Sequence, residues 1–345
     1  MDLLLSVPEF DDELRSEIAR NYAGTSVQAA APGVLLAHLP RTTTAPFPLV
    51  FARQCLPNAQ FLACPSVRAA AEFLVSAIIG VIPDGSPWRL HVVPCYGIGT
   101  AGLNRCRLIQ EAVIEQLQKR RRHLRRSLLE STKPFSETES LVQLVLVTPE
   151  SGYLSAAVAP LPSLSYRVVS PFLKGEIPIA SDKAAPSRAF AKLVETELRL
   201  GQTITPGETC VDLGATPGSW TYVAVQRGAQ VTSVDRSPLR DDLMRNPAVE
   251  FVQGDAFTFR PRQPVDWLLC DVIAAPERSI DLLIEWLKAG LCRRFVVTIK
   301  FKGSADYPKL DGLKAALEGL AGRWSIAHLC ANKNEACAFG VARNR

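Results

Sequence analysis

The residues best suited to chemistry begin with a short turn. An apolar run, Cys210–Leu213, leads directly into three turn-forming residues, Gly214, Pro217 and Gly218. Glycine allows positive φ and a close approach of the backbone to a ligand, and the first N–H groups of a helix can donate hydrogen bonds to that ligand. The pattern therefore predicts a nucleotide-binding turn between a buried strand and a helix that begins near Trp220.

Three acids follow this turn, and each closes an apolar run: Asp235, Asp255 and Asp271. Ligands of an open parallel sheet bind outside the carboxyl ends of its strands, so we expect the three carboxylates to lie around one crevice. Asp235 follows Gly214 by about 20 residues, the spacing at which an acid typically accepts hydrogen bonds from ribose hydroxyls. Taken alone, Asp255 is also compatible with an acid that starts an ordinary turn.

The elements that must position these residues alternate between strand and helix patterns over residues 185–345. This alternation predicts an α/β domain with a doubly wound sheet. Beyond the turn we expect helices around 280–287 and 310–317, a strand at 295–299 that ends at Lys300, and a closing strand pair at 324–329 and 336–341. Before the turn, residues 186–200 predict a helix that Gly201 ends, with Lys192 lying off its apolar stripe.

The N-terminal half predicts two smaller units and a linker, divided as 1–45, 46–160 and 161–184. The first is a small α+β unit with apolar runs at 3–7 and 33–39 around a helix at 10–22. The second has strand patterns at 49–52, 88–93, 141–147 and 153–158, with a helix at 66–79 capped by Ser66 and one long helix at 104–129.

The long helix carries the densest run of charge in the sequence. Its cations are Lys119, Arg120, Arg121, Arg122, Arg125 and Arg126. Such a run is often a solvated helix face, and it is also the electrostatic footprint expected of a protein that binds RNA phosphates. No aromatic residue is interleaved with these cations, so stacking on single-stranded bases is not indicated there.

The amino-acid composition is compatible with many functions. The 345 residues are 47% hydrophobic and 21% charged with a formal net charge of +5, which permits a polyanionic partner without requiring one. The N-terminus lacks the basic segment of a signal peptide, and the most apolar window, 69–82, is too short to cross a bilayer, so we expect a cytoplasmic protein. Nine cysteines without a Cys-x-x-Cys pair indicate reduced, buried thiols and no metal site.

The turn does not match the Gly-x-Gly-x-x-Gly fingerprint of dinucleotide-binding proteins. Residues Asp212–Trp220 instead resemble the S-adenosylmethionine (SAM) loop of the FtsJ-type RNA 2'-O-methyltransferases, departing only at Ser219, where that family prefers glycine. The resemblance implies a Rossmann-like, SAM-dependent methyltransferase domain at 185–345. It also implies a set of SAM-binding residues: Ser187, Gly214, Thr216, Pro217, Gly218, Ser219, Asp235, Asp255 and Asp271.

A lysine–aspartate–lysine–glutamate tetrad marks the same family, and here it falls on Lys192, Asp271, Lys300 and Glu335. The resemblance implies that these four residues are catalytic, with a lysine as the general base for a ribose 2'-hydroxyl. A lysine can act as a base only if its pKa falls toward neutrality, through desolvation or a nearby cation. Lys302 competes with Lys300 for this role.

The N-terminal extension, the residues 185–188 and the strand end at 269–271 resemble those members that modify a cytidine ribose in 23S rRNA. The order of elements in 46–160 is similar to a THUMP domain, an RNA-binding module, so we expect RNA as the partner. One alternative is an inactive RNA-binding protein with a methyltransferase fold, and another is a SAM enzyme for small molecules or proteins. Base methylation is disfavoured because neither a catalytic Pro-Cys loop nor an Asn-Pro-Pro-Tyr motif lies in the SAM domain.

Overall fold

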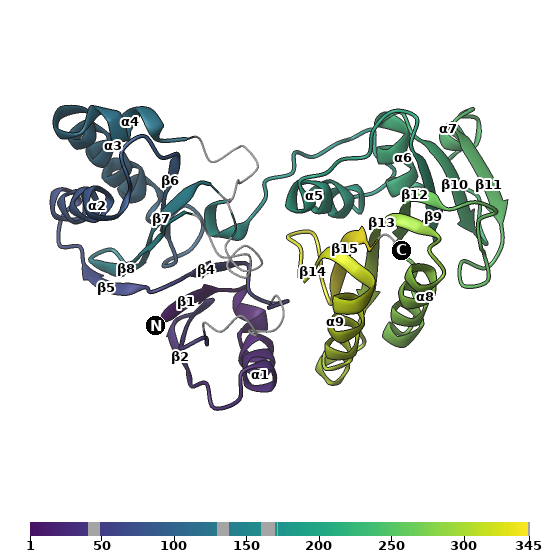
Figure 1. Cartoon of the computed structure of the whole chain (residues 1–345), viewed down its shortest axis with the longest axis horizontal. Coiled ribbons are helices and arrows are strands. Elements are labelled where there is room, and N and C mark those ends of the chain that lie inside the picture. Colours follow the sequence, from purple (N-terminus) through teal and green to yellow (C-terminus); the bar gives the residue numbers. More distant parts are fainter. Residues whose placement is uncertain (41–48, 130–137, 160–169, 171, 344–345) are drawn as a thin grey trace. The chain divides into compact units, whose positions relative to one another are not determined.

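The computed structural model describes residues 1–40, 49–129, 138–159, 170 and 172–343 (Figure 1). The chain forms two compact units, Met1–Ile177 and Pro178–Arg345. The boundary predicted near residue 45 and the first part of the linker predicted at 161–184 lie outside the described residues. In the part of the chain that is described, no helix combines the length and the apolar character needed to cross a membrane.

The first unit begins with an antiparallel sheet in the order β2-β3-β1-β4. Its strands are β1 (Asp2–Leu5), β2 (Val27–Ala31), β3 (Val34–Ala37) and β4 (Gln54–Leu56). The short η1 (Pro8–Phe10) leads into α1 (Asp11–Asn21), which buries Leu14 and Ile18. The apolar runs predicted at 3–7 and 33–39 thus form paired strands, and the sheet takes its last strand from beyond residue 45.

The strand predicted at 49–52 does not form, although Val50 and Phe51 are buried. Their backbone N–H groups donate instead to the carboxylate of Glu17, at 2.8 Å and 3.2 Å. Glu17 is itself buried, on α1. Buried N–H groups must find an acceptor, and here a side chain far away in sequence supplies the acceptors that a neighbouring strand would otherwise provide.

The second sheet of this unit has the order β5-β8-β7-β6, with β6 and β7 parallel. Its strands are β5 (Gln60–Ala63), β6 (Trp88–Pro94), β7 (Ser140–Thr148) and β8 (Ser151–Ala157). The sheet shares an apolar core with α2 (Val67–Val81) and α3 (Leu103–Arg120). Ser66 caps α2 as predicted, because its side chain accepts the Ala69 N–H. The likeness to a THUMP domain stays a prediction based on the order of elements.

The long helix predicted at 104–129 is broken at Arg121, and the chain resumes as α4 (Arg122–Ser127). The break divides the basic run between two helices. Like charges three and four residues apart on one helix repel each other, which disfavours a continuous helix through this run. Leu124 of α4 is buried, and its carbonyl accepts the indole N–H of Trp88 at 2.8 Å, so tertiary contacts hold α4 in its separate orientation.

The second unit contains a seven-stranded sheet in the order β11-β10-β9-β12-β13-β15-β14. Its strands are β9 (Thr209–Leu213), β10 (Gln230–Asp235), β11 (Val249–Gln253), β12 (Val265–Cys270), β13 (Cys292–Lys300), β14 (Ala321–Ala327) and β15 (Glu335–Ala342). The strands from β11 to β13 are parallel, whereas β15 is antiparallel to both its neighbours. The α/β prediction is confirmed, with an antiparallel pair at one edge.

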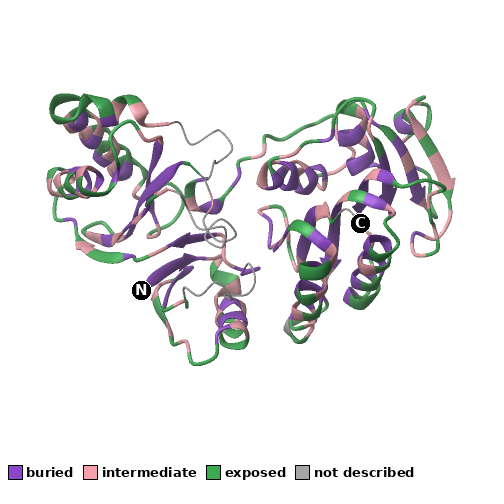
Figure 2. Ribbon diagram, in the orientation of Figure 1, coloured by how far each residue is buried: buried purple, intermediate pink, exposed green. Residues whose placement is uncertain are grey.

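Helices cover both faces of this sheet (Figure 1). They are α5 (Phe190–Leu200), α6 (Ser219–Gln226), α7 (Asp241–Met244), α8 (Pro276–Lys288) and α9 (Lys309–Leu320). Cys210, Trp267 and Leu269 pack with α5 and α6 in one apolar cluster, and the alternate residues of these strands point to the opposite face. Both faces of the central strands are therefore buried (Figure 2).

Candidate functional site

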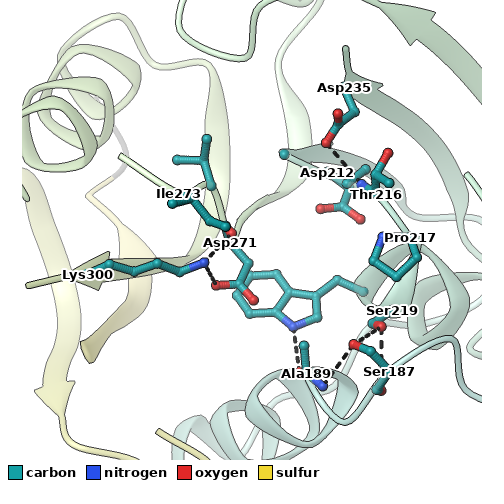
Figure 3. Close-up of a pocket in the computed structure, with 14 residues that line it drawn as sticks. Ser187, Ala189, Asp212, Thr216, Pro217, Ser219, Asp235, Asp271, Ile273 and Lys300 are labelled. Atoms are coloured by element: carbon teal, nitrogen blue, oxygen red, sulfur yellow. Dashed lines mark hydrogen bonds and ion pairs between the residues drawn. The ribbon is translucent and has the colours of Figure 1, made fainter. Parts of the chain in front are cut away.

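A cavity of the second unit lies between β9 and β12. Here the order of the strands reverses, because β10 and β11 lie on one side of β9 and β12 and β13 lie on the other. In doubly wound sheets this switch point is where ligands bind, outside the carboxyl ends of the strands. The cavity has a volume of about 360 Å³. It is lined by Ser187, Ala189, Asp212, Gly214, Ala215, Thr216, Pro217, Ser219, Trp220, Asp235, Asp271, Val272, Ile273 and Lys300 (Figure 3).

The turn after β9 requires glycine at two positions. Gly214 has a φ of +74°, and a Cβ atom there would lie 2.8 Å from the Cα atom of Val272. Gly218 has a φ of +106°, and its Cβ would lie 2.3 Å from a methyl carbon of Leu243. Positive φ and these close approaches exclude larger residues. The predicted turn thus brings its backbone to the cavity wall, although Gly218 itself is not part of the lining.

Polar contacts hold the turn against neighbouring segments. The Thr216 N–H donates to the Asp235 carboxylate at 3.1 Å, which joins the turn to the end of β10. On the opposite side, the hydroxyls of Ser187 and Ser219 lie 2.7 Å apart. Ser219, where the FtsJ-type pattern prefers glycine, therefore contacts the segment before α5 through a side chain that glycine lacks.

The structure does not bring Asp255 to the cavity wall. One of its carboxylate oxygens accepts the Phe257 N–H at 2.9 Å, and the other accepts from the Arg236 guanidinium at 2.8 Å. These two contacts hold the pKa of Asp255 below its ordinary value. The contact with Phe257, two residues onward, is that of an acid that starts a turn, and a role for Asp255 in ligand binding stays a prediction.

The four residues of the predicted tetrad converge at one edge of the cavity. The Lys192 Nζ lies 3.0 Å and 2.9 Å from the two Asp271 carboxylate oxygens and 2.9 Å from a Glu335 oxygen. The Lys300 Nζ lies 3.1 Å from Asp271 Oδ1 and donates to the Asp271 carbonyl at 2.9 Å. Asp271 and Lys300 line the cavity, whereas Lys192 and Glu335 do not.

Lys192 is held as a cation. Its side chain is only 8% exposed. Burial disfavours the charged ammonium, but the Asp271 and Glu335 carboxylates outweigh that effect and hold the pKa of Lys192 above its ordinary value. The pKa of Lys192 is therefore not lowered toward neutrality, because the effect of the two carboxylates is larger than that of burial.

Asp212 is a cavity residue that sequence reasoning did not select as a site. It is 1% exposed, and burial raises its pKa to about 7 even though Thr221 donates to one carboxylate oxygen from its N–H at 2.9 Å and from its hydroxyl at 2.7 Å. The sequence signal was its position inside the apolar run that enters the turn. Ala189, Val272 and Ile273 also line the cavity, and no pattern in the sequence marked them. Trp220, another lining residue, is the last residue of the loop pattern at 212–220.

The basic segment, residues 119–126, belongs to the first unit and is largely exposed. Lys119, Arg120, Arg121, Arg122 and Arg126 are exposed, and Arg125 is half-buried. Lys119 pairs with Glu115 at 2.5 Å on the same helix. Across the described residues, no group of His, Cys, Asp and Glu side chains is arranged to hold a metal ion.

Parts of the chain match known proteins. Residues 185–300 match the model of the FtsJ-like methyltransferase family. The ribosomal RNA large subunit methyltransferase M of Pseudomonas putida strain GB-1 is 40% identical over 159 residues, which cover 42% of this chain and 44% of that protein. The protein of the same name from Thauera aminoaromatica is 43% identical over 122 residues, which cover 34% of each. The chain thus matches less than half the length of these relatives.

Solved structures are more distant. TrmN from Thermus thermophilus matches with a TM-score of 0.34 and 14% identity, covering 99% of both chains. This likeness is too weak to bear on function. The family match covers the turn, Lys192, Asp271 and Lys300. Residues 185–300 of this chain are accordingly similar to the FtsJ-like methyltransferases.

Proposed function

We propose that this chain transfers a methyl group from SAM to the 2'-hydroxyl of a ribose in 23S rRNA, at a cytidine. The observation that carries the proposal is the convergence of two lysine side chains on one carboxylate, that of Asp271, at the edge of a cavity behind a glycine turn. The names of the relatives support rRNA of the large subunit as the substrate. The choice of cytidine comes from the resemblance of the domain entrance and of the strand end at 269–271.

The cavity suits SAM. The turn at 214–219 brings exposed backbone close to a ligand, and Asp235 ends β10 where a carboxylate accepts hydrogen bonds from ribose hydroxyls. The Asp271 carboxylate complements a positively charged sulfonium. When bound, SAM supplies an activated methyl group, so the protein has only to align the reacting atoms and prepare the hydroxyl.

In this proposal Lys300 is the general base and Lys192 is a positioning residue. Lys300 lines the cavity, and its Nζ is held by the carbonyl and the carboxylate of Asp271. It would accept the proton of the 2'-hydroxyl and so prepare that oxygen to receive the methyl group. Lys192, which is buried and does not line the cavity, stays protonated and fixes Asp271 and Glu335.

The N-terminal half would present RNA to this site. Its basic segment offers a group of exposed cations to phosphates, and phosphate contacts supply affinity without reading sequence. An RNA-binding protein with an inactive methyltransferase fold is the alternative. The complete tetrad speaks against it, because an inactive fold gives no reason to hold four charged side chains together at a cavity.

The test compares two lysines that lie two residues apart. Lys300→Ala is expected to lower methyl transfer into large-subunit rRNA by roughly 100-fold or more, while SAM still binds in calorimetry. Lys302→Ala is the matched control, since Lys302 is exposed and does not line the cavity. Unchanged transfer by Lys300→Ala would remove Lys300 from the mechanism.

The substrate is tested separately. Tritium from labelled SAM should enter RNA, and ribose-methylation mapping of rRNA from cells with and without the gene should show one cytidine that depends on it. Label that enters a protein or a small molecule, with none in RNA, would refute the substrate. A dependent site at another nucleotide would refute only the choice of cytidine.

A further inference from the structure

One apolar side chain stands exposed at the rim of the cavity. Ile273 lines the cavity and is 88% exposed. Among the described residues of Pro178–Arg345, Met244 is the only other large hydrophobic side chain that is exposed, at 40%. Single exposed apolar residues are common on protein surfaces. Ile273 differs because it belongs to the wall of the site where the chemistry is proposed.

The backbone on both sides of Ile273 is fixed. Asp271 is held by Lys192 and Lys300, and its N–H donates to the Leu213 carbonyl at 3.3 Å. The Cα atom of Val272 packs closely against Gly214. On the far side, Pro276 is buried and begins α8. Ile273 is therefore presented at the rim by a supported segment.

Ile273 lies toward one end of the cavity. Figure 3 shows Ile273 on the side where Asp271 and Lys300 lie, while Ser187, Pro217 and Ser219 lie on the other side. The turn residues are those proposed to hold SAM, so the side with Lys300 is where the acceptor ribose must enter. A nucleoside offers an apolar base face next to its 2'-hydroxyl, and an aliphatic side chain can cover that face without needing a hydrogen-bond partner.

We infer that Ile273 forms the apolar wall against which the target nucleotide packs, and so positions its 2'-hydroxyl toward Lys300. This inference rests on the proposed function and assigns Ile273 as a positioning residue for the RNA substrate. Ile273 has no role in holding SAM in this inference. Contact of this kind does not read base edges, so Ile273 orients the nucleotide without selecting its identity.

The test uses the full chain and two variants of one residue. Ile273→Ser should lower kcat/KM for an rRNA fragment about tenfold, because it removes most of the apolar area of the side chain. Ile273→Val, which loses one methylene, should lower it by roughly fourfold or less. The SAM dissociation constant from calorimetry and the Tm should stay at wild-type values in both, since Ile273 is exposed and supports no core.

The outcomes are distinguishable. Wild-type kcat/KM in Ile273→Ser would overturn the inference and leave the proposed function intact. A loss of SAM affinity as large as the loss of kcat/KM would also overturn it, because Ile273 would then belong to the methyl-donor side. If the wild-type chain methylates no RNA at all, the proposed function fails, and the inference fails with it.

Discussion

Replacement of Lys192 by methionine would remove the charge that holds two acids together. The Lys192 ammonium contacts both Asp271 and Glu335, and the side chains of these acids are only 16% and 12% exposed. Methionine preserves the length and the apolar part of the side chain but leaves two carboxylates facing each other without their shared cation. The variant therefore tests whether Lys192 acts mainly on the order of the site.

The expected cost is large. Removal of one partner from a buried ion pair costs about 3–5 kcal/mol, and partial access of water to both acids places Lys192→Met near the lower end, at about 3 kcal/mol. For a unit of this size that corresponds to a fall in Tm of about 10 °C. Lys300→Met is the comparison: Lys300 is 23% exposed, and Asp271 would keep Lys192, so we expect about 1 kcal/mol or less.

The pH dependence follows from the raised pKa of Lys192. The folded protein holds this proton more tightly than the unfolded chain does, so the stabilisation is complete below the ordinary value of 10.5 and is lost as the pH rises through the higher folded value. Urea titrations at pH 7 to 9 should show a constant difference between wild type and Lys192→Met that shrinks above pH 10.5. Equal losses for Lys192→Met and Lys300→Met at pH 7 would refute the buried-cation reasoning.

Three further predictions concern the turn, the buried acid and the basic segment. Gly214→Ala should destabilise the protein by about 1–3 kcal/mol, because its φ is positive and a Cβ would meet Val272. Gly312→Ala in α9 should stabilise it by up to about 1 kcal/mol, because a Cβ there would meet nothing beyond the adjacent backbone of its own helix within 4 Å. Thermal unfolding of both variants checks the contrast. The folded pKa of Asp212, about 7, lies above its unfolded value of 3.8, so the cost of ionising it in the folded state grows between these two pH values and is complete above pH 7. Asp212→Asn should therefore unfold at a higher temperature than wild type at pH 8, and this advantage should disappear toward pH 4. Reversal of charge at Arg121 and Arg122 should weaken RNA binding and flatten its salt dependence in filter binding, and an unchanged salt slope would assign the basic segment to a merely solvated surface.

Much of the fold could be predicted because it follows from local patterns. Alternating or continuous apolar runs marked the strands on either side of the turn, and Ser66 and Gly201 marked a helix start and a helix end. Two predicted elements failed where residues far away in sequence take part. Glu17 accepts the N–H groups of Val50 and Phe51, and Trp88 holds α4 after a break that repulsion within the basic run also favours.

The candidate site also has features that local sequence predicts and features that it does not. The sequence by itself determined the turn, since only glycine tolerates its backbone at Gly214 and Gly218. The four charged residues of the tetrad were selected by the resemblance to the FtsJ-type pattern. Only the tertiary structure decided that Lys192 is buried between two acids and that Asp255 accepts a hydrogen bond from Phe257 of its own loop. It also decided that Ile273 is exposed at the rim of the cavity. Backbone preference acts between neighbours in the chain, whereas burial and charge pairing depend on residues such as Lys192 and Asp271, 79 positions apart, that only folding brings into contact.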